Sequence, residues 1–545
     1  MFVVGVIAGA VALLFSYDLR TLGGIFVPEL ASQALFSVTP GTIESQAIAE
    51  LGSLAKYSAF SGAIVGCLVV YGAIGVLLLP LYRRLQSRGK ALNMLVFMLV
   101  PFAIMLAIAV VLTKITEIAS QPLTLPLIAL FLVPPHVAFG LVFYYLFAAP
   151  PRRKKPSPVV RAGTDQPDLA ASHVSRKVSR KEFISIMGVI AGGSIASALF
   201  YQWFSSGNAG AGSAPLAPAS PTSLANSTSM LPAAVQSLYR SEITPSDEFY
   251  RVDTNIVTPL IDASMWSLMV GGLVNNSLSL SYEDLKSMPS VERYVTLECV
   301  SNQVGGDLTS TAHWKGVMLK DVLEKAGIKN EATYIVFRCY DGYDVGVPLD
   351  RGLGGAFLAY ELNGSPLPRD HGYPLRAIVP GLYGMMNPKW ITSIELVGTE
   401  YEGFWQRRGW SNDAMYKIHS TIVVPGNALA KRFGDLGVPT TVKVGSKVPV
   451  AGVAFAGDRG ISKVELSTDG GNTWQPAHIK QPLSSANTWV LWSAEWSPPS
   501  EGRYEITVRA FDGSGNMQGM GFQPPFPSGS SGYHTVSVTA TRQAA

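Results

Sequence analysis

Four long apolar runs occupy the first 150 residues and constrain the fold of this chain more than any other feature. They cover Met1–Ser16, Ala59–Leu81, Ala91–Thr113 and Leu123–Ala149. A helix that spans a bilayer needs about 20 apolar residues, and the last three runs reach that length. The first run is short enough for a signal peptide, but it lacks a basic segment before its apolar core. We interpret residues 1–150 as four transmembrane helices.

Basic residues cluster on one side of these spans. Arg83, Arg84, Arg88 and Lys90 lie between the second and third runs, and four more basic residues occupy 152–155. Loops rich in Lys and Arg stay in the cytoplasm. The pattern therefore predicts a cytoplasmic N-terminus and an external loop over Asp18–Lys56.

A single histidine, His136, stands in the fourth run after two prolines. It could ligate a haem within the membrane. A b-type haem normally takes two such ligands, and no other span offers a histidine. We therefore favour a histidine that forms hydrogen bonds within the helix bundle.

A second basic segment precedes a fifth apolar run. Residues 151–182 hold nine Lys or Arg against three Asp or Glu and are predicted to be a cytoplasmic loop, and 183–204 is predicted to be a fifth transmembrane helix. The junction Ser179–Ile184 (SRKEFI) fits either a degenerate twin-arginine export signal or an ordinary charge stop. In both cases the chain after residue 205 lies outside the cell. Residues 205–235 are rich in Gly, Ala, Ser and Pro, which predicts a flexible linker.

The composition becomes that of a globular domain at 236–425. Short strand-like runs alternate with loops, and one amphipathic helix is predicted at Leu319–Ala326. The strand-like runs are Tyr294–Glu298, Tyr334–Arg338, Ala377–Val379 and Ile394–Val397. The pattern indicates an α+β domain.

The chain has three cysteines. Cys67 lies in an apolar run, which predicts a small buried side chain. Cys299 ends a predicted strand and enters a polar loop, where a soft thiolate can face a cavity and hold a metal. Taken alone, Cys299 would be interpreted as a buried free thiol, and only the surrounding motifs favour a metal ligand.

The motifs around Cys299 resemble the sulfite oxidase family. The run His371-Gly-Tyr-Pro-Leu-Arg376 and the segment Thr296-Leu-Glu-Cys299 carry the resemblance, which extends over about 236–540. It implies that Cys299 is the protein ligand of molybdenum and that the cofactor is molybdopterin. The matching positions implied to bind the cofactor are Phe249, Tyr250, Arg251, Asp253, Cys299, Asp341, His371, Arg376, Asn387 and Lys389. The resemblance assigns catalysis to Cys299, Arg251 and Trp410, and Cys339 is expected to pack in the core.

Two departures from the family pattern concern the substrate. The family follows its cysteine with a run containing arginines, one of which binds sulfite, whereas this chain has Gln303 and Val304 there. Trp410 stands where the family has a tyrosine. Less positive charge favours a neutral or monoanionic oxo substrate over a dianion.

The last part, 435–541, is predicted to be all β because apolar residues alternate at Tyr504, Ile506, Val508 and Ala510. It resembles the immunoglobulin-like domain that follows the catalytic domain in the same family. That resemblance implies a homodimer.

The sequence thus predicts a multi-domain protein: an α-helical membrane region, an α+β molybdopterin domain and a C-terminal immunoglobulin-like β-sandwich. It is interpreted as a membrane-anchored oxidoreductase that transfers oxygen on a small sulfur or nitrogen oxo substrate outside the cytoplasm. Such an enzyme takes its cofactor in the cytoplasm and crosses the membrane folded, which favours the twin-arginine route. The soluble part of the sequence shows no haem domain of the cytochrome b5 type, so electrons would pass through an external cytochrome or quinone-linked protein. The alternatives are a sulfoxide or N-oxide reductase and a cofactor-free scaffold. Nothing indicates a nucleic-acid partner.

Overall fold

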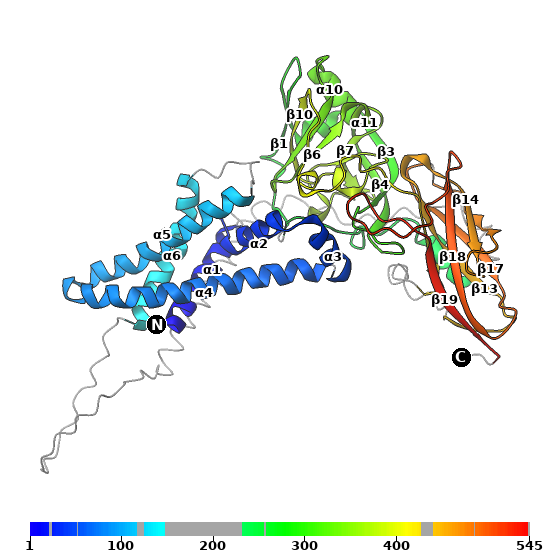
Figure 1. The fold of residues 1–545 in the computed structure, drawn as a ribbon. Helices are drawn as coiled ribbons and strands as arrows, with labels where there is room; N and C mark the ends of the chain where they lie inside the picture. Colours follow the sequence, from blue (N-terminus) through cyan, green and yellow to red (C-terminus); the bar gives the residue numbers. More distant parts are fainter. Residues whose placement is uncertain are drawn as a thin grey trace, which may run out of the picture. The chain divides into compact units, whose positions relative to one another are not determined.

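The computed structural model describes residues 1–20, 24–51, 53–116, 125–147, 231–255, 258–426, 440–483 and 485–542. By its packing the chain divides into two compact units (Figure 1). The first comprises Met1–Ala34, Ala59–Thr116 and Leu123–Ala214, and the second comprises the remaining residues. The predicted loop 151–182, the predicted fifth helix 183–204 and most of the predicted linker 205–235 lie outside the described residues.

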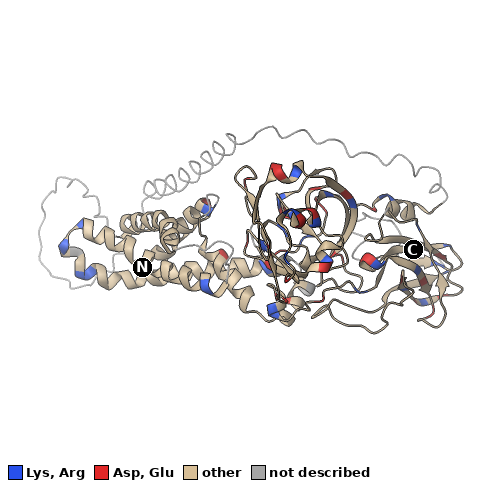
Figure 2. Cartoon of the chain, turned by 90° about the horizontal axis from the view of Figure 1, so that it is seen from above, with Lys and Arg blue, Asp and Glu red and all other residues tan. Residues whose placement is uncertain are grey.

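Four helices of the described chain are long and apolar enough to cross a membrane. They are α1 (Phe2–Arg20), α4 (Ser53–Leu85), α5 (Lys90–Thr116) and α6 (Leu125–Phe147). Helix α6 packs against α1 and α5. Leu77, Leu99 and Leu130 on three of these helices are exposed, and the helices show few charges along their length (Figure 2). Apolar side chains that face outward are what a lipid environment accommodates.

His136 forms hydrogen bonds inside the bundle, as predicted. Its Nδ1 lies 2.6 Å from the carbonyl oxygen of Leu132, and its Nε2 lies 3.1 Å from the hydroxyl of Tyr71. Because a carbonyl oxygen only accepts, Nδ1 donates and Nε2 accepts from Tyr71. Both ring nitrogens are therefore satisfied by protein groups.

Between α1 and α4 the predicted external loop contains two further helices, α2 (Val27–Val38) and α3 (Gly41–Leu51). Pro28 and Glu29 stand in the first turn of α2, where proline costs no hydrogen bond and an acidic side chain favours the helix dipole. Pro40 separates the two helices. The segment Leu35–Ser58 belongs by its packing to the second compact unit.

The catalytic domain is built on two sheets. The first has the order β2-β1-β10-β5-β6, and β1 and β10 are parallel. Its strands are β1 (Ser267–Gly272), β2 (Leu278–Ser281), β5 (Tyr334–Cys339), β6 (Asp344–Pro348) and β10 (Ile391–Val397). The pairing joins residues that are far apart in sequence, so this sheet holds the loops before and after it in fixed positions.

The second sheet places the candidate site. Its order is β3-β4-β7-β8, and β9 pairs with β7. Its strands are β3 (Ser290–Glu298), β4 (Thr309–Met318), β7 (Phe357–Leu362), β8 (Ser365–Pro366) and β9 (Arg376–Ile378). Cys299 directly follows β3, and Arg376 begins β9. Helix α10 (Leu319–Ala326) packs against both sheets, and its bounds confirm the predicted helix.

The C-terminal domain is a sandwich of two sheets, β11-β13-β17-β16 and β12-β19-β18-β14-β15. The first contains β11 (His419–Val424), β13 (Val448–Phe455), β16 (His478–Ile479) and β17 (Val490–Trp496). The second contains β12 (Thr441–Lys443), β14 (Ile461–Ser467), β15 (Gln475–Pro476), β18 (Gly502–Asp512) and β19 (His534–Thr541). Ile506, Val508 and Ala510 are buried between the sheets, which confirms the predicted alternation.

Candidate functional site

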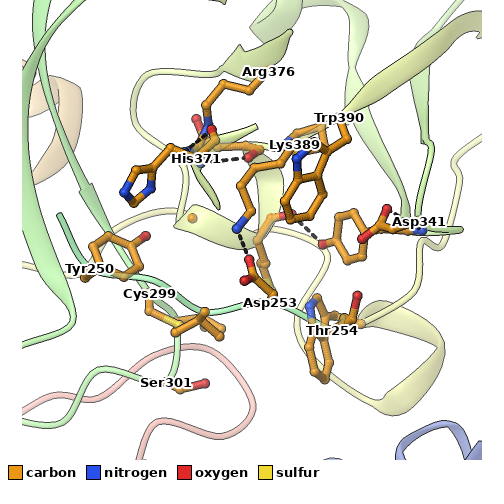
Figure 3. A pocket seen from close by; sticks show the side chains of 18 of the residues that line it. Tyr250, Asp253, Thr254, Cys299, Ser301, Asp341, His371, Arg376, Lys389 and Trp390 are labelled. Carbon is orange, nitrogen blue, oxygen red and sulfur yellow. Dashed lines mark hydrogen bonds and ion pairs between the residues drawn. The ribbon is translucent and has the colours of Figure 1, made fainter. Parts of the chain in front are cut away.

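One pocket gathers almost all the residues predicted to form the site (Figure 3). Of the predicted residues only Arg251 is absent from its lining. The predicted residues that line it are Phe249, Tyr250, Asp253, Cys299, Asp341, His371, Arg376, Asn387, Lys389 and Trp410. They come from loops and strand ends that are separated by up to about 160 positions in the sequence.

The thiol of Cys299 faces this pocket from the end of β3. The backbone N–H of Cys299 donates to the carbonyl oxygen of Leu308 at 2.9 Å, and its own carbonyl accepts from the N–H of Asn302 at 2.9 Å. These bonds fix the backbone on both sides of the sulfur. Burial raises the pKa of the Cys299 thiol to about 11, and hydrogen bonds from Ser301 oppose the rise. A bound metal cation would instead favour the thiolate.

Glu298, the residue before Cys299, is buried and is held by two polar side chains. Oε1 of Glu298 lies 3.1 Å from Nδ1 of His419 and accepts a hydrogen bond from Nδ2 of Asn302 at 3.0 Å. Burial raises the pKa of Glu298, while His419 and Asn302 lower it. His419 begins β11, so the C-terminal domain takes part in positioning the cysteine loop.

Arg376 is a fully enclosed cation at the pocket. Its two terminal nitrogens donate to the carbonyl oxygens of His371 at 3.3 Å and Asn387 at 3.1 Å, and its guanidinium lies over the ring of Trp314. Its Nε is buried without a hydrogen-bond partner, and no salt bridge among the described residues gives it a carboxylate. Burial lowers the pKa of Arg376 to about 10. A buried cation without a counter-charge is costly, so the site is suited to an anionic ligand.

Two neighbours fix Arg376 in place. Asn387 accepts from the N–H of Val379 at 2.7 Å, and its amide nitrogen donates to two backbone carbonyls. His371 donates from Nε2 to the carbonyl oxygen of Ser246 at 2.9 Å. Burial and the nearby Arg376 lower the pKa of His371 to about 4, so its ring is neutral at pH 7. Asn387 and His371 therefore fix the backbone around the guanidinium of Arg376 and do not add a second charge.

Lys389 is the second cation of the pocket, and its charge is balanced. Its ammonium group forms an ion pair with Asp253 and donates to the carbonyl oxygen of Asp370 at 3.1 Å (Figure 3). Burial lowers the pKa of Lys389, and the charges of Arg251 and Lys56 lower it further. The next residue, Trp390, has a φ of 55°. This left-handed conformation is rare for a bulky residue and is found at functional sites.

Arg251, predicted to orient the substrate or the pterin, is held by other residues. Its Nε pairs with Asp253, one terminal nitrogen lies 2.7 Å from a carboxylate oxygen of Asp370, and the other donates to the hydroxyl of Thr258 at 2.9 Å. All three of its nitrogens are therefore engaged, and Asp370 supplies a carboxylate for its charge in addition to the Asp253 that it shares with Lys389. The sequence match gave the position of this arginine but not the direction of its side chain.

Trp410 closes another side of the pocket. It is 4% exposed, and its Nε1–H is buried without a hydrogen-bond partner. Its ring packs edge-on against Trp405 at 6.3 Å and against Phe526 at 5.2 Å between ring centroids. Phe526 comes from the C-terminal domain. An unpaired indole donor that faces a pocket can bind an oxygen atom of a ligand.

Several lining residues were not predicted. Thr254, Ser301, Tyr343, Trp390 and Trp405 lie beside predicted residues in the sequence. Ile48 comes from the segment between α1 and α4, and nothing in the local sequence pattern pointed to it.

Asp341, which was predicted, accepts a hydrogen bond from the side-chain amide of Asn255 at 2.8 Å. Burial raises the pKa of Asp341 to about 6.

Comparison with known proteins identifies the family. Residues 255–405 match the model of the oxidoreductase molybdopterin binding domain, and residues 414–523 match the Mo-co oxidoreductase dimerisation domain. Sulfite oxidase of Arabidopsis thaliana is 30% identical over 334 residues, which cover 52% of this chain and 83% of that protein. The chain belongs to the sulfite oxidase family. The molybdopterin cofactor predicted from the sequence is thereby confirmed.

Further proteins are similar to parts of this chain. Mitochondrial sulfite oxidase of Rattus norvegicus is 32% identical over 321 residues, which span 52% of this chain and 58% of the rat protein. The uncharacterized oxidoreductase YuiH of Bacillus subtilis is 38% identical over 150 residues, covering 27% of this chain and 74% of that protein. The crystal structure of the sulfane dehydrogenase SoxCD from Paracoccus pantotrophus aligns with a TM-score of 0.48 at 22% identity, covering 55% and 81% of the two chains.

The residues of the pocket fit the family's cofactor. Molybdopterin is an anionic pterin that carries a metal, so it needs a thiolate ligand and positive charge. Cys299 supplies the thiol, and Arg376 is a buried cation whose Nε has no partner in the protein. Lys389, whose ammonium group is paired with Asp253, lies on the same side of the pocket (Figure 3).

Proposed function

We propose that this protein is a membrane-anchored molybdopterin oxidoreductase that transfers an oxygen atom to or from a small sulfur or nitrogen oxo compound outside the cytoplasm. One observation carries the proposal: the thiol of Cys299 and the guanidinium of Arg376, which has no carboxylate partner among the described residues, line one pocket. A thiol that can bind a metal and a buried cation that can bind an anion, both in one pocket, fit a cofactor in which an anionic organic molecule holds a metal.

The side chains take separate roles in this proposal. Cys299 holds the metal, and Arg376 provides the counter-charge for the pterin phosphate. His371 and Asn387 keep Arg376 in place through their carbonyl oxygens. The molybdenum cofactor supplies two-electron oxygen-atom transfer when it is bound. The protein places the substrate and excludes water from the reacting atoms.

The pocket favours a neutral or monoanionic substrate. Arg251 does not line it, and neither Gln303 nor Val304 is among its lining residues. Among the described lining residues Arg376 is needed for the cofactor and Lys389 is neutralised by Asp253. Among the described residues the indole N–H of Trp410, another lining residue, has no hydrogen-bond partner and is a candidate donor to a substrate oxygen. A dianion such as sulfite therefore meets little unpaired positive charge.

These observations also favour the second candidate, a reductase that removes oxygen from a sulfoxide or N-oxide. Such a substrate is neutral and presents one acceptor oxygen, which suits a single N–H donor. The four apolar helices support an anchor next to a membrane electron pool. An external cytochrome or quinone-linked protein would supply the two electrons, or accept them in the oxidative direction.

The proposed location follows from the charge of the loops. Arg83, Arg84 and Arg88 follow the apolar part of α4, which supports a cytoplasmic position for that end of the helix. With the predicted fifth span at 183–204, the catalytic and C-terminal domains lie outside in this proposal. The C-terminal domain matches a dimerisation domain, and we propose a homodimer.

Steady-state assays test the proposal. Purified full-length protein is analysed for molybdenum and pterin, and its turnover is measured with sulfite plus an electron acceptor and with methionine sulfoxide plus a reduced donor. Stoichiometric cofactor and turnover of either substrate support the enzyme. A preparation that carries cofactor and turns over neither compound class contradicts the proposed substrates, and one that never binds cofactor contradicts the enzyme.

A further inference from the structure

Helix α3 presents one face to the catalytic domain. Gly41, Glu44, Ser45 and Ile48 recur at intervals of three and four residues, which places them on one side of a helix. Glu44 and Ser45 are buried, whereas Ile43 on another side is 59% exposed. Thr42 and Gln46, on other sides of the helix, are exposed as well, so its packing rests mainly on the buried face.

The first turn of α3 fits closely against the tryptophan-bearing loop. A Cβ atom at Gly41 would stand 2.7 Å from the carbonyl oxygen of Arg408 and 2.7 Å from a ring carbon of Phe526. Only glycine allows this approach. One turn later, Glu44 lies near enough to Arg408 for the arginine to lower its pKa against a larger effect of burial. The same Phe526 packs on Trp410 of the pocket.

The far end of that face reaches the pocket itself. Ile48 lines it together with Cys299 and Trp410. The early part of the chain, drawn in blue, is visible at the edge of the close-up (Figure 3). Every other lining residue lies between positions 249 and 410, so Ile48 comes from outside the domain that carries the chemistry.

We propose that α3 forms one wall of the Cys299 pocket and that Ile48 limits the size of the molecules that reach the thiol. The segment between two membrane-spanning helices thereby takes part in substrate selection. The effect on substrate selection rests on the proposed function, whereas the position of Ile48 in the pocket wall does not depend on that function. The wall is apolar at Ile48, so it selects for size and for an apolar group next to the reacting oxo group.

The geometric part is tested by thiol labelling. Full-length protein is produced without molybdenum, and the labelling of Cys299 by N-ethylmaleimide and by the larger N-pyrenylmaleimide is followed by peptide mass spectrometry. Cys67 and Cys339, both buried, are resolved as separate peptides. Ile48→Ala should speed the reaction of Cys299, most of all with the larger reagent, and Ile48→Trp should slow it. Ile43→Ala and Ile43→Trp, on an exposed side of the same helix, are the matched controls and should react like the native protein.

The two substitutions at Ile48 distinguish a pocket wall from a loss of folding. General unfolding would raise the labelling rate in both, whereas a wall predicts opposite signs. The proposal is overturned if both shift in the same direction, or if the pair at Ile48 behaves like the pair at Ile43.

The catalytic part is tested by substrate size. In cofactor-loaded protein, Ile48→Ala should raise kcat/KM for a bulky aryl sulfoxide relative to dimethyl sulfoxide by about 10-fold, the discrimination given by small changes in an apolar pocket. An unchanged ratio overturns the role in selection. If labelling behaves as expected but no sulfoxide or sulfite is turned over, the wall stands and the proposed function fails.

Discussion

Oε1 of Glu298 lies 3.1 Å from Nδ1 of His419, and this contact joins the residue before the pocket thiol to the first strand of the C-terminal sandwich. Both side chains are largely enclosed, and Nε2 of His419 has no hydrogen-bond partner. The position of the cysteine loop therefore depends on the neighbouring domain.

Removal of this contact should destabilise the protein. His419→Ala leaves a buried carboxylate oxygen without one of its partners, which costs about 1–3 kcal/mol. Urea unfolding of the full chain in detergent, followed by tryptophan fluorescence, measures the change. Glu298→Gln should partly rescue His419→Ala, because an amide is easier to bury than a carboxylate. Strictly additive effects of the two substitutions would contradict a direct interaction.

The thiol of Cys299 should be required for turnover but not for folding. Cys299→Ser keeps the size of the side chain and loses the soft ligand, so the expected result is native unfolding behaviour with turnover below a few per cent. Cys339→Ala is the matched control, since Cys339 is buried in the core and is not itself among the lining residues, and it should keep most of its activity. Full activity of Cys299→Ser at equal cofactor loading would disprove the ligand assignment.

Sulfite should be a poor substrate, and an added arginine should improve it. A charge-assisted hydrogen bond contributes about 1.5–3 kcal/mol, or about 10- to 150-fold in affinity. Val304→Arg is therefore expected to raise kcat/KM for sulfite more than for a neutral sulfoxide. Gln303→Arg, at an exposed neighbouring position, is the comparison. Native turnover of sulfite with a micromolar KM would show that the existing cations suffice.

The side chain of Glu44 should make stability depend on pH. Burial raises its pKa from an ordinary 4.5 to about 8, against the opposing charge of Arg408. The folded protein therefore binds this proton more tightly than the unfolded chain does. The contribution of Glu44 to stability is complete below pH 4.5 and is lost as the pH rises through about 8. Between pH 5 and pH 9 the Tm of Glu44→Gln should rise relative to the Tm of the native protein. If the two curves of Tm against pH run parallel, the raised pKa of Glu44 is contradicted.

The membrane topology is tested with intact spheroplasts. External protease should release a soluble catalytic fragment by cutting within 205–233, because the basic loops at 83–90 and 152–155 are predicted to be cytoplasmic. A reporter of cytoplasmic leakage is the control. Protection of this segment in intact spheroplasts, with cleavage only after lysis, would reverse the orientation.

The sequence predicted those parts of the structure that depend on local pattern. The helix Leu319–Ala326 follows from apolar residues at helical spacing, and the predicted strand Tyr294–Glu298 lies within β3. The motifs that match the family predicted that distant residues such as Cys299 and Arg376 lie at one site. They did not show where Arg251 points, because that depends on Asp253 and Asp370 across the fold. Ile48 was missed because it reaches the pocket only through tertiary packing.

The parallel pairing of β1 with β10 also determines when the pocket can exist. Gly272 of β1 pairs with Leu396 of β10, so the sheet closes only after the nascent chain has been made beyond that residue. Pairing of such distant segments comes late in folding. The complete pocket therefore forms only after both strands have left the ribosome, so a cofactor that needs the whole pocket binds after this part of the domain has been made.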